Sequence, residues 1–139
     1  DVGAVLHVHS RFATALACLN KAIPAFHYMV AVAGGESIRC ADYATFGSQA
    51  LSNAAIAALK DRKACLLAHH GMIALGSAPE LALRLAIEVE ALAATYVAAL
   101  QAGAPRALPA REMTKVLALF RTYGTAEFPQ DGLQRIRAR

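Results

Sequence analysis

Cysteines are scarce in this 139-residue chain, and no disulfide framework can be built from them. The three, Cys18, Cys40 and Cys65, are odd in number, widely spaced and never form a CxxC pair. This usage fits a protein of the reducing cytoplasm. The first ten residues also lack the basic segment and the apolar run of a secretory signal. Together these absences predict a cytoplasmic protein.

Long apolar runs and basic tracts are missing as well. The longest apolar stretch, 79–101, is interrupted by Glu80, Arg84, Glu88 and Glu90, which excludes a membrane span. The net charge is +4, but basic residues are scattered and do not interleave with aromatics as in single-stranded nucleic-acid binders. We therefore expect neither a membrane nor a nucleic-acid partner, and the mild positive charge is compatible with a small anionic substrate.

Hydrophobic residues make up 57% of the chain, enough for one domain over 1–139 with a sizeable core. Alternation, caps and turn residues predict strands over 4–9, 37–40, 64–68 and 72–76, an extended run over 25–33, and helices over 11–19, 48–60, 79–101 and 110–123. Short turns between consecutive strands favour an α/β fold with α+β-like layering, in which helices cover a mostly antiparallel central sheet. The polar, basic segment 125–139 is expected to be a flexible tail.

Four of the five histidines fall into two clusters. His7 and His9 alternate in the run VLHVHS, and residues two apart in a strand point to the same face. His70 ends the apolar strand CLLAH and precedes Gly71 in a polar turn. Three imidazoles on one divalent metal, with a fourth position open, form a catalytic zinc arrangement. The pattern therefore predicts a zinc site, with ordinary buried histidines as the alternative.

Two long segments resemble the class II aldolase and adducin family, in particular its L-fuculose-1-phosphate aldolases. They are HVHSRFATALACLNKAIPAFHYMVAVAGGESIRCADYATFGS and CLLAHHGMIALG, and the resemblance extends from about residue 4 to residue 123. It implies a class II aldolase-like fold and a homotetramer. It also implies a zinc-dependent aldolase that cleaves a ketose 1-phosphate, such as L-fuculose 1-phosphate, to dihydroxyacetone phosphate and an aldehyde.

The same resemblance assigns roles to individual residues. The implied zinc ligands are His7, His9 and His70. His69 is a neighbour of the ligands. Tyr28 matches a tyrosine that reaches into the adjacent subunit's site and protonates the aldehyde oxygen. Phe46 matches an aromatic residue in the wall around the aldehyde, and Tyr123 matches a C-terminal tyrosine near the substrate, with ordinary packing as the alternative for both.

The departure from the family lies at the N-terminus. The family's phosphate-binding loops and its catalytic glutamate precede the His-x-His motif, whereas this chain starts at Asp1, just before that strand. The resemblance therefore implies a domain truncated at its N-terminus, inactive alone and derived from a longer protein. Glu36, Asp42 and Asp61 lie at positions without a base role in the family, so no general base is assigned.

The chemistry of aldol cleavage explains why such residues are needed. Cleavage leaves negative charge on the dihydroxyacetone phosphate part, and a metal held by neutral imidazoles keeps its +2 charge to stabilise it. A tyrosine with an ordinary pKa of ~10 is a suitable acid for an alkoxide. Alternatives are a pentulose-phosphate 4-epimerase or methylthioribulose-phosphate dehydratase of the same family, or a non-catalytic adducin-like interaction domain. The three metal-type histidines argue against the last, because adducin heads lack them.

Overall fold

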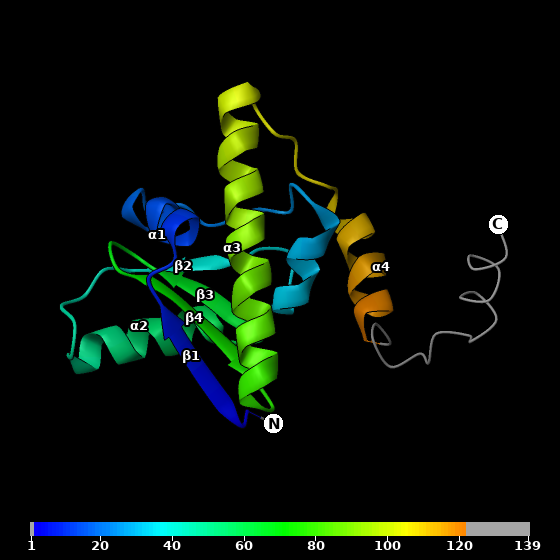
Figure 1. Ribbon diagram of the computed structural model, residues 1–139. Helices are drawn as coiled ribbons and strands as arrows, with labels where there is room; N and C mark the ends of the chain where they lie inside the picture. Colours follow the sequence, from blue (N-terminus) through cyan, green and yellow to red (C-terminus); the bar gives the residue numbers. More distant parts are fainter. Residues whose placement is uncertain (1, 122–139) are drawn as a thin grey trace, which may run out of the picture.

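The computed structural model describes residues 2–121, and within them four strands form one sheet (Figure 1). The strand order is β1-β4-β3-β2. The strands are β1 (Ala4–Val8), β2 (Arg39–Ala41), β3 (Ala64–Leu67) and β4 (Gly71–Gly76). β4 runs antiparallel to β1 and β3, while β2 runs parallel to β3. The sheet is mostly antiparallel, which confirms the predicted fold class.

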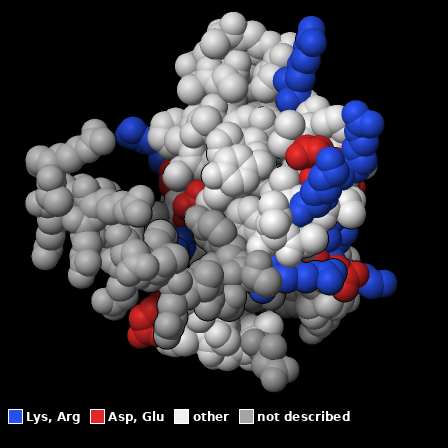
Figure 2. All heavy atoms as spheres, turned by 90° about the vertical axis from the view of Figure 1, so that its right-hand side faces the viewer, with Lys and Arg blue, Asp and Glu red and all other residues white. Residues whose placement is uncertain are grey.

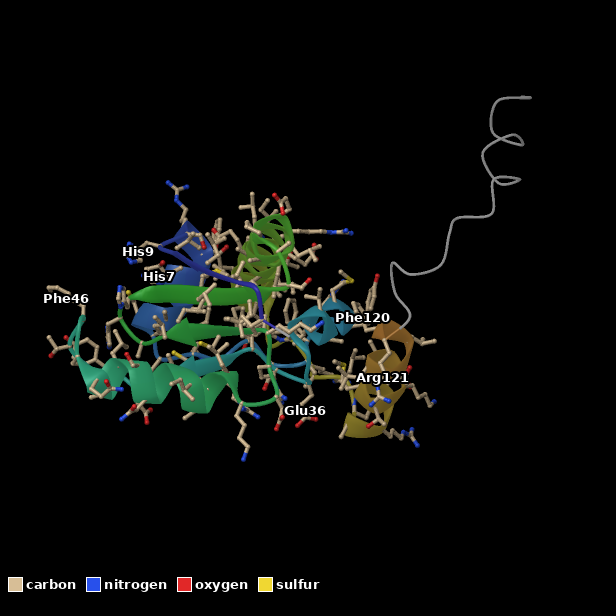
Figure 3. All side chains as sticks on the ribbon, turned by 90° about the horizontal axis from the view of Figure 1, so that it is seen from below. His7, His9, Glu36, Phe46, Phe120 and Arg121 are labelled. Atoms are coloured by element: carbon tan, nitrogen blue, oxygen red, sulfur yellow. The ribbon has the colours of Figure 1, made fainter. Side chains whose placement is uncertain are left out.

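Helices cover both faces of this sheet. They are α1 (Arg11–Cys18), the 3-10 helix η1 (Tyr28–Ala33), α2 (Gln49–Leu59), α3 (Pro79–Ala102) and α4 (Ala110–Phe120). Helices α1 and α3 pack against each other and against the sheet, and α2 lies on the opposite face (Figure 3). Beside α3, on the side away from α1, η1 packs against α4 (Figure 1). The central part of the molecule therefore has three layers.

The largest part of the core lies between the sheet, α1 and α3. Leu16, Leu66, Met72 and Val89 are completely buried there. On the other face, a smaller cluster that includes Cys65 joins β3 to α2. β1 contributes its inward-facing residues to the larger core, whereas Val5 on its other face is 65% exposed. The face of β1 that also carries His7 and His9 is therefore open.

The extended run predicted over 25–33 is wrong, because residues 28–33 form η1. His27 precedes this helix, and its Nδ1 accepts a hydrogen bond from the Met29 N–H at 3.2 Å. Gly34 ends the helix in the left-handed conformation, with φ of 87°. Nearly every position of AFHYMVAVA is apolar, so its period does not distinguish a strand from a short helix.

The other predicted elements agree with the structure within two residues at each end, as far as the chain is described. Ser48 caps α2, since its Oγ accepts a hydrogen bond from the Leu51 N–H at 3.2 Å. The final helix, predicted over 110–123, is observed up to Phe120. Tyr123 and the predicted tail 125–139 lie outside the described residues.

The described surface carries both signs of charge. On the face shown in Figure 2, much of the surface is uncharged, and Asp and Glu side chains lie among the Lys and Arg side chains. The field over this face therefore comes from charges of mixed sign. Among residues 2–121, no helix is both long and apolar enough to cross a membrane.

Candidate metal centre

Three histidines meet at one end of the sheet. His7 and His9 project from the open face of β1 and from the residue that follows it (Figure 3), while His70 lies in the turn between β3 and β4. Because β1 pairs with β4, this turn lies beside the end of β1. The ring centroids are separated by 4.7 Å for His7 and His9, 4.8 Å for His7 and His70, and 5.0 Å for His9 and His70.

The ring nitrogens are close enough to share one ion. One ligand nitrogen from each histidine lies within 4.8 Å of the other two. Nitrogens bound tetrahedrally to zinc at ~2.0–2.1 Å are separated by roughly 3.3 Å. Side-chain adjustments of about an ångström would therefore bring all three into bonding distance.

His7 is held in the orientation that a ligand needs. Its Nδ1 lies 2.9 Å from the carbonyl oxygen of Met72. A carbonyl can only accept, so Nδ1 carries the proton and donates it, which leaves the lone pair of a neutral ring on Nε2. That Nε2 lies 3.0 Å from Nε2 of His9. Metal-binding histidines commonly use a backbone carbonyl in this way to fix the tautomer and the ring plane.

Gly71 makes the close approach of the two segments possible. A Cβ at this position would lie 2.5 Å from the carbonyl oxygen of Val8, 2.8 Å from Cδ2 of His9 and 3.4 Å from Cε1 of His7. No side chain fits there without displacing backbone and ligand rings. The glycine of the His-His-Gly motif is therefore required by packing against β1.

His69 has a different position from its neighbour. Its backbone is left-handed, with φ of 54°, a conformation in which histidine is more frequent than most residues. Its ring contacts Tyr43 edge-on, with centroids 5.9 Å apart, and its Nε2 lies 3.4 Å from Nδ2 of Asn20. The left-handed residue turns the chain so that His69 and His70 face different neighbours.

The electrostatics of the cluster favour the neutral form of His70. The pKa of His70 is lowered from its ordinary value, first by partial burial and then by the nearby rings of His7 and His9. A lowered pKa keeps the ring unprotonated near neutral pH, which is the form that binds a metal. Among the described residues, no carboxylate joins this histidine cluster. Three imidazole nitrogens with no acidic ligand form a donor set that fits zinc.

A carboxylate that sequence reasoning did not assign contacts the segment that follows His9. Glu90 of α3 accepts hydrogen bonds from the Ser10 hydroxyl at 2.7 Å, the Phe12 N–H at 2.8 Å and the Ala13 N–H at 2.9 Å. These groups are the N-cap and first turn of α1, which begins directly after His9 and Ser10. In the sequence, Glu90 is only one of four charges that argue against a membrane span. Its role becomes visible only when α3 is placed beside α1.

Of the other predicted site residues, the described part of the chain contains Tyr28 and Phe46, and neither joins the histidine cluster. Tyr28, at the start of η1, is 50% exposed. In Figures 1 and 3, η1 lies across α3 from the end of β1 that carries His9. Phe46 is 81% exposed, in the segment between β2 and α2, at the same end of the sheet as His9 (Figure 3). Packing within residues 2–121 therefore does not account for Phe46.

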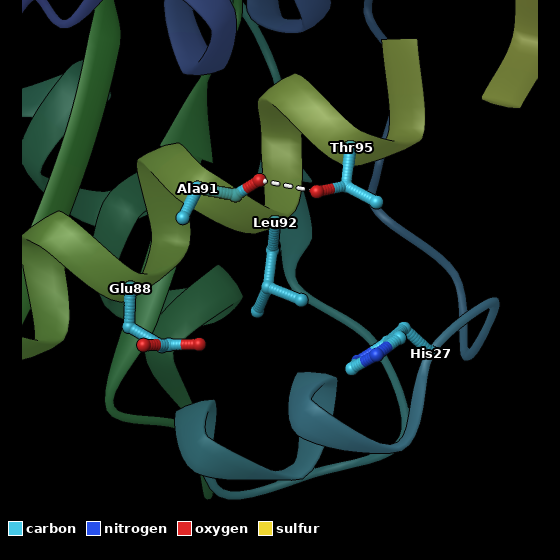
Figure 4. Close-up of a pocket in the computed structure, with 5 residues that line it drawn as sticks. All are labelled: His27, Glu88, Ala91, Leu92 and Thr95. Atoms are coloured by element: carbon cyan, nitrogen blue, oxygen red, sulfur yellow. Dashed lines mark hydrogen bonds between the residues drawn. The ribbon is translucent and has the colours of Figure 1, made fainter. Parts of the chain in front are cut away.

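A separate small hollow lies between α3 and the segment before η1 (Figure 4). Its lining residues are His27, Glu88, Ala91, Leu92 and Thr95. The Thr95 hydroxyl donates to the carbonyl of Ala91 at 2.9 Å, and Nδ1 of His27 accepts from Met29. Two of the polar groups that line the hollow, the Thr95 hydroxyl and Nδ1 of His27, are therefore already hydrogen-bonded within the chain.

Comparison with known proteins identifies the family. The sequence profile of the class II aldolase and adducin N-terminal domain matches residues 1–97. The chain belongs to this family. It is 58% identical over 130 residues to the 5-methylthioribulose-1-phosphate/5-deoxyribulose-1-phosphate aldolase of Rhodospirillum rubrum. It is also 51% identical over 125 residues to the L-fuculose phosphate aldolase of Escherichia coli K12.

A solved structure shows the same class II aldolase fold. The chain superposes on an L-fuculose 1-phosphate aldolase with a TM-score of 0.83 and 41% identity, over 87% of this chain and 57% of that one. The two relatives above are matched over 93% and 89% of this chain, but over only 59% and 58% of their own lengths. The chain thus spans somewhat more than half the length of the curated relatives it matches.

Proposed function

We propose that this chain contributes the metal centre of a zinc-dependent aldolase that cleaves a ketose 1-phosphate to dihydroxyacetone phosphate and an aldehyde. The observation that carries the proposal is the convergence of His7, His9 and His70, with the tautomer of His7 fixed by the Met72 carbonyl. When bound, zinc would stabilise the negative charge that cleavage leaves on the dihydroxyacetone phosphate part. The names of the relatives support this class of substrate.

The two kinds of aldolase that this chain resembles have substrates with one part in common, the part released as dihydroxyacetone phosphate. Ketose 1-phosphates cleaved between their third and fourth carbons all release dihydroxyacetone phosphate, and differ only in the aldehyde. The substrate named for the first relative leaves an aldehyde ending in a methyl or methylthio group, whereas L-fuculose phosphate leaves a hydroxylated one. Phe46, exposed at the histidine end of the sheet, is proposed as part of the wall that contacts this variable aldehyde.

The substrate phosphate needs donors other than the first turn of α1. A helix N-terminus attracts anions, and α1 begins close to His9. However, its Phe12 and Ala13 N–H groups already donate to the Glu90 carboxylate. A bound phosphate would have to displace a fixed negative charge there. Phosphate binding is therefore assigned to other parts of the active protein.

Tyr28 is proposed as the acid that protonates the aldehyde oxygen, acting from a neighbouring subunit of a homotetramer. Within one chain, η1 and the histidine cluster lie on opposite sides of α3, so Tyr28 cannot serve its own chain's centre without a large movement. Tyr28 is half exposed, as a residue that meets another subunit would be before assembly. In a closed ring, one surface of each subunit meets a different surface of the next.

Product analysis on the full-length protein tests the reaction. Purified protein with zinc should release dihydroxyacetone phosphate from L-fuculose 1-phosphate or 5-deoxyribulose 1-phosphate, and His9→Ala should abolish this release. A pentulose phosphate with inverted configuration, or a dehydrated product, would instead identify the epimerase or the dehydratase. No turnover of any of these substrates by the zinc-loaded protein would contradict the proposal.

A mixing experiment tests the role of Tyr28. Full-length Tyr28→Phe and His9→Ala subunits should each be nearly inactive, since one lacks the acid and the other a ligand. Mixed oligomers should recover part of the activity, because some sites combine an intact tyrosine with an intact cluster. No recovery in oligomers shown to be mixed would mean that Tyr28 does not act across an interface.

A further inference from the structure

The three histidines of the cluster are not supported equally. His7 has a side-chain bond to the Met72 carbonyl, and His70 lies in a turn closed by its own N–H, which donates to Leu67. His9 is exposed and follows the last residue of β1. Its only side-chain hydrogen bond among those described is to His7. The position of the His9 ring therefore depends on how its backbone is held.

The residue after His9 is anchored by a long-range contact. Ser10 occupies the N-cap position of α1, yet its hydroxyl makes no cap bond to the helix. Instead it donates to Oε2 of Glu90 at 2.7 Å, across 80 positions of sequence. Glu90 takes over the usual capping role, because its two oxygens accept the Phe12 and Ala13 N–H groups. The Ser10 hydroxyl can therefore donate to Glu90, whereas a capping serine usually accepts a hydrogen bond from a helix N–H.

We propose that Glu90 is a positioning residue for the metal centre, which holds His9 in place through Ser10 and the first turn of α1. The inference rests on the proposed metal site. Three hydrogen bonds to one ionised carboxylate form a strong, directional anchor, and the negative charge also favours the helix N-terminus. The anchor ties the His9 end of β1 to α3, which is packed against the core through Val89.

Glu90 is not proposed as a ligand or as the general base. Both of its oxygens are engaged by the start of α1, and it is absent from the group of residues that converge on the candidate metal position. It acts on the metal only through the backbone that carries His9. Its loss should therefore weaken and distort metal binding without removing a ligand.

Glu90→Gln in the purified chain is the direct test. Glutamine keeps the shape but replaces one carboxylate oxygen by a donor, so at least one of the three bonds is lost. We expect zinc affinity, measured by competition with a chromophoric chelator, to fall about 10-fold, at the lower end for residues that orient metal ligands. The visible absorption of the cobalt-substituted protein should also change, because it reports ligand geometry. Glu88→Gln, which removes the same charge from the same helix, should leave both readouts unchanged.

A second control separates positioning from general stability. Val89→Ala leaves the Glu90 contacts intact but truncates a fully buried neighbour, and should lower the free energy of unfolding without altering the cobalt spectrum. Ser10→Ala removes the hydrogen bond to Glu90 that is nearest to His9, together with the longer contact of the hydroxyl with the Met72 sulfur at 3.5 Å, so it should fold and still weaken zinc binding. If Glu90→Gln does not fold, the zinc affinity of Ser10→Ala tests the role of Glu90 instead.

The outcomes are distinct. If the wild-type chain binds no zinc, the metal site fails, and this inference fails with it. If the wild type binds zinc and the Glu90→Gln and Ser10→Ala variants bind it equally well, only the role of Glu90 is overturned. The role of Glu90 is likewise overturned if Val89→Ala weakens zinc binding as much as Glu90→Gln does.

Discussion

Replacing Gly71 by alanine should damage the metal centre more than the fold. A Cβ at this position would lie 2.5 Å from the Val8 carbonyl oxygen, whereas ordinary van der Waals contact begins at 3.4 Å. β1 would have to move by up to about 0.9 Å, and this is large compared with the tolerance of roughly 0.2 Å in metal–ligand distances. The atoms displaced include the backbone that carries His7 and His9.

The expected magnitudes follow from this displacement. Forcing extra volume into a tightly packed site typically lowers the free energy of unfolding by ~1–3 kcal/mol. We expect zinc affinity to fall at least ~10-fold, which corresponds to about 1.4 kcal/mol. Chelator competition measures the affinity, and urea unfolding of the metal-free protein measures the stability.

Gly103→Ala is the matched control for this substitution. Nothing lies within 4 Å of a Cβ at Gly103, and its backbone is extended, so the variant should bind zinc as the wild type does. A folded Gly71→Ala protein with wild-type zinc affinity would refute the argument that Gly71 sets the distance between the ligand-bearing segments.

Three further outcomes are expected. Phe46→Ala should leave the free energy of unfolding within ~0.5 kcal/mol of wild type, because Phe46 is exposed. In the full-length enzyme, the variant should change kcat/KM differently for substrates with different aldehyde halves. Equal changes in kcat/KM for all substrates would contradict the proposed contact between Phe46 and the aldehyde. Because the pKa of His70 is lowered, the folded state binds fewer protons at this residue than the unfolded state does, so the contribution of His70 to the stability of the metal-free protein should be present above pH ~6.5 and lost as the pH falls below it. Urea titrations of the wild type and of His70→Ala at several pH values measure this contribution. An identical pH dependence of stability in both proteins would contradict the prediction. Burial raises the pKa of Cys65 to about 12, so iodoacetamide at pH 8 should modify the exposed Cys18 and leave Cys65 unmodified in the folded protein. Peptide mass spectrometry measures the labelling, and comparable labelling of both cysteines would contradict a buried Cys65 thiol.

Local signals predicted most of the fold. The cap Ser48, the proline that opens α3 and the turns around the strands placed most element ends within two residues. The failure at 25–33 has a physical reason: the segment is apolar at nearly every position, and the cap that makes it helical is a histidine ring whose Nδ1 accepts from Met29. Histidine is not among the residues that usually signal a helix start.

The parts of the candidate site that depend on residues close together in the sequence could be predicted. Alternation in β1 places His7 and His9 on one face, and the hairpin between β3 and β4 carries His70 back to them. The supporting contacts were not predictable, because they join distant positions. The carbonyl of Met72 is 65 positions from His7, and Glu90 is 80 positions from Ser10. Such pairs follow from tertiary packing, which local patterns do not encode.

X-ray absorption of the zinc-loaded chain tests the central claim most directly. The account predicts one zinc ion per chain with a first shell of nitrogen or oxygen at ~2.0–2.1 Å, and multiple-scattering features of three imidazoles. Removing one ligand with His9→Ala should reduce those features to two rings and weaken binding. A shell containing sulfur at ~2.3 Å, or a spectrum unchanged by His9→Ala, would contradict a metal centre built from His7, His9 and His70.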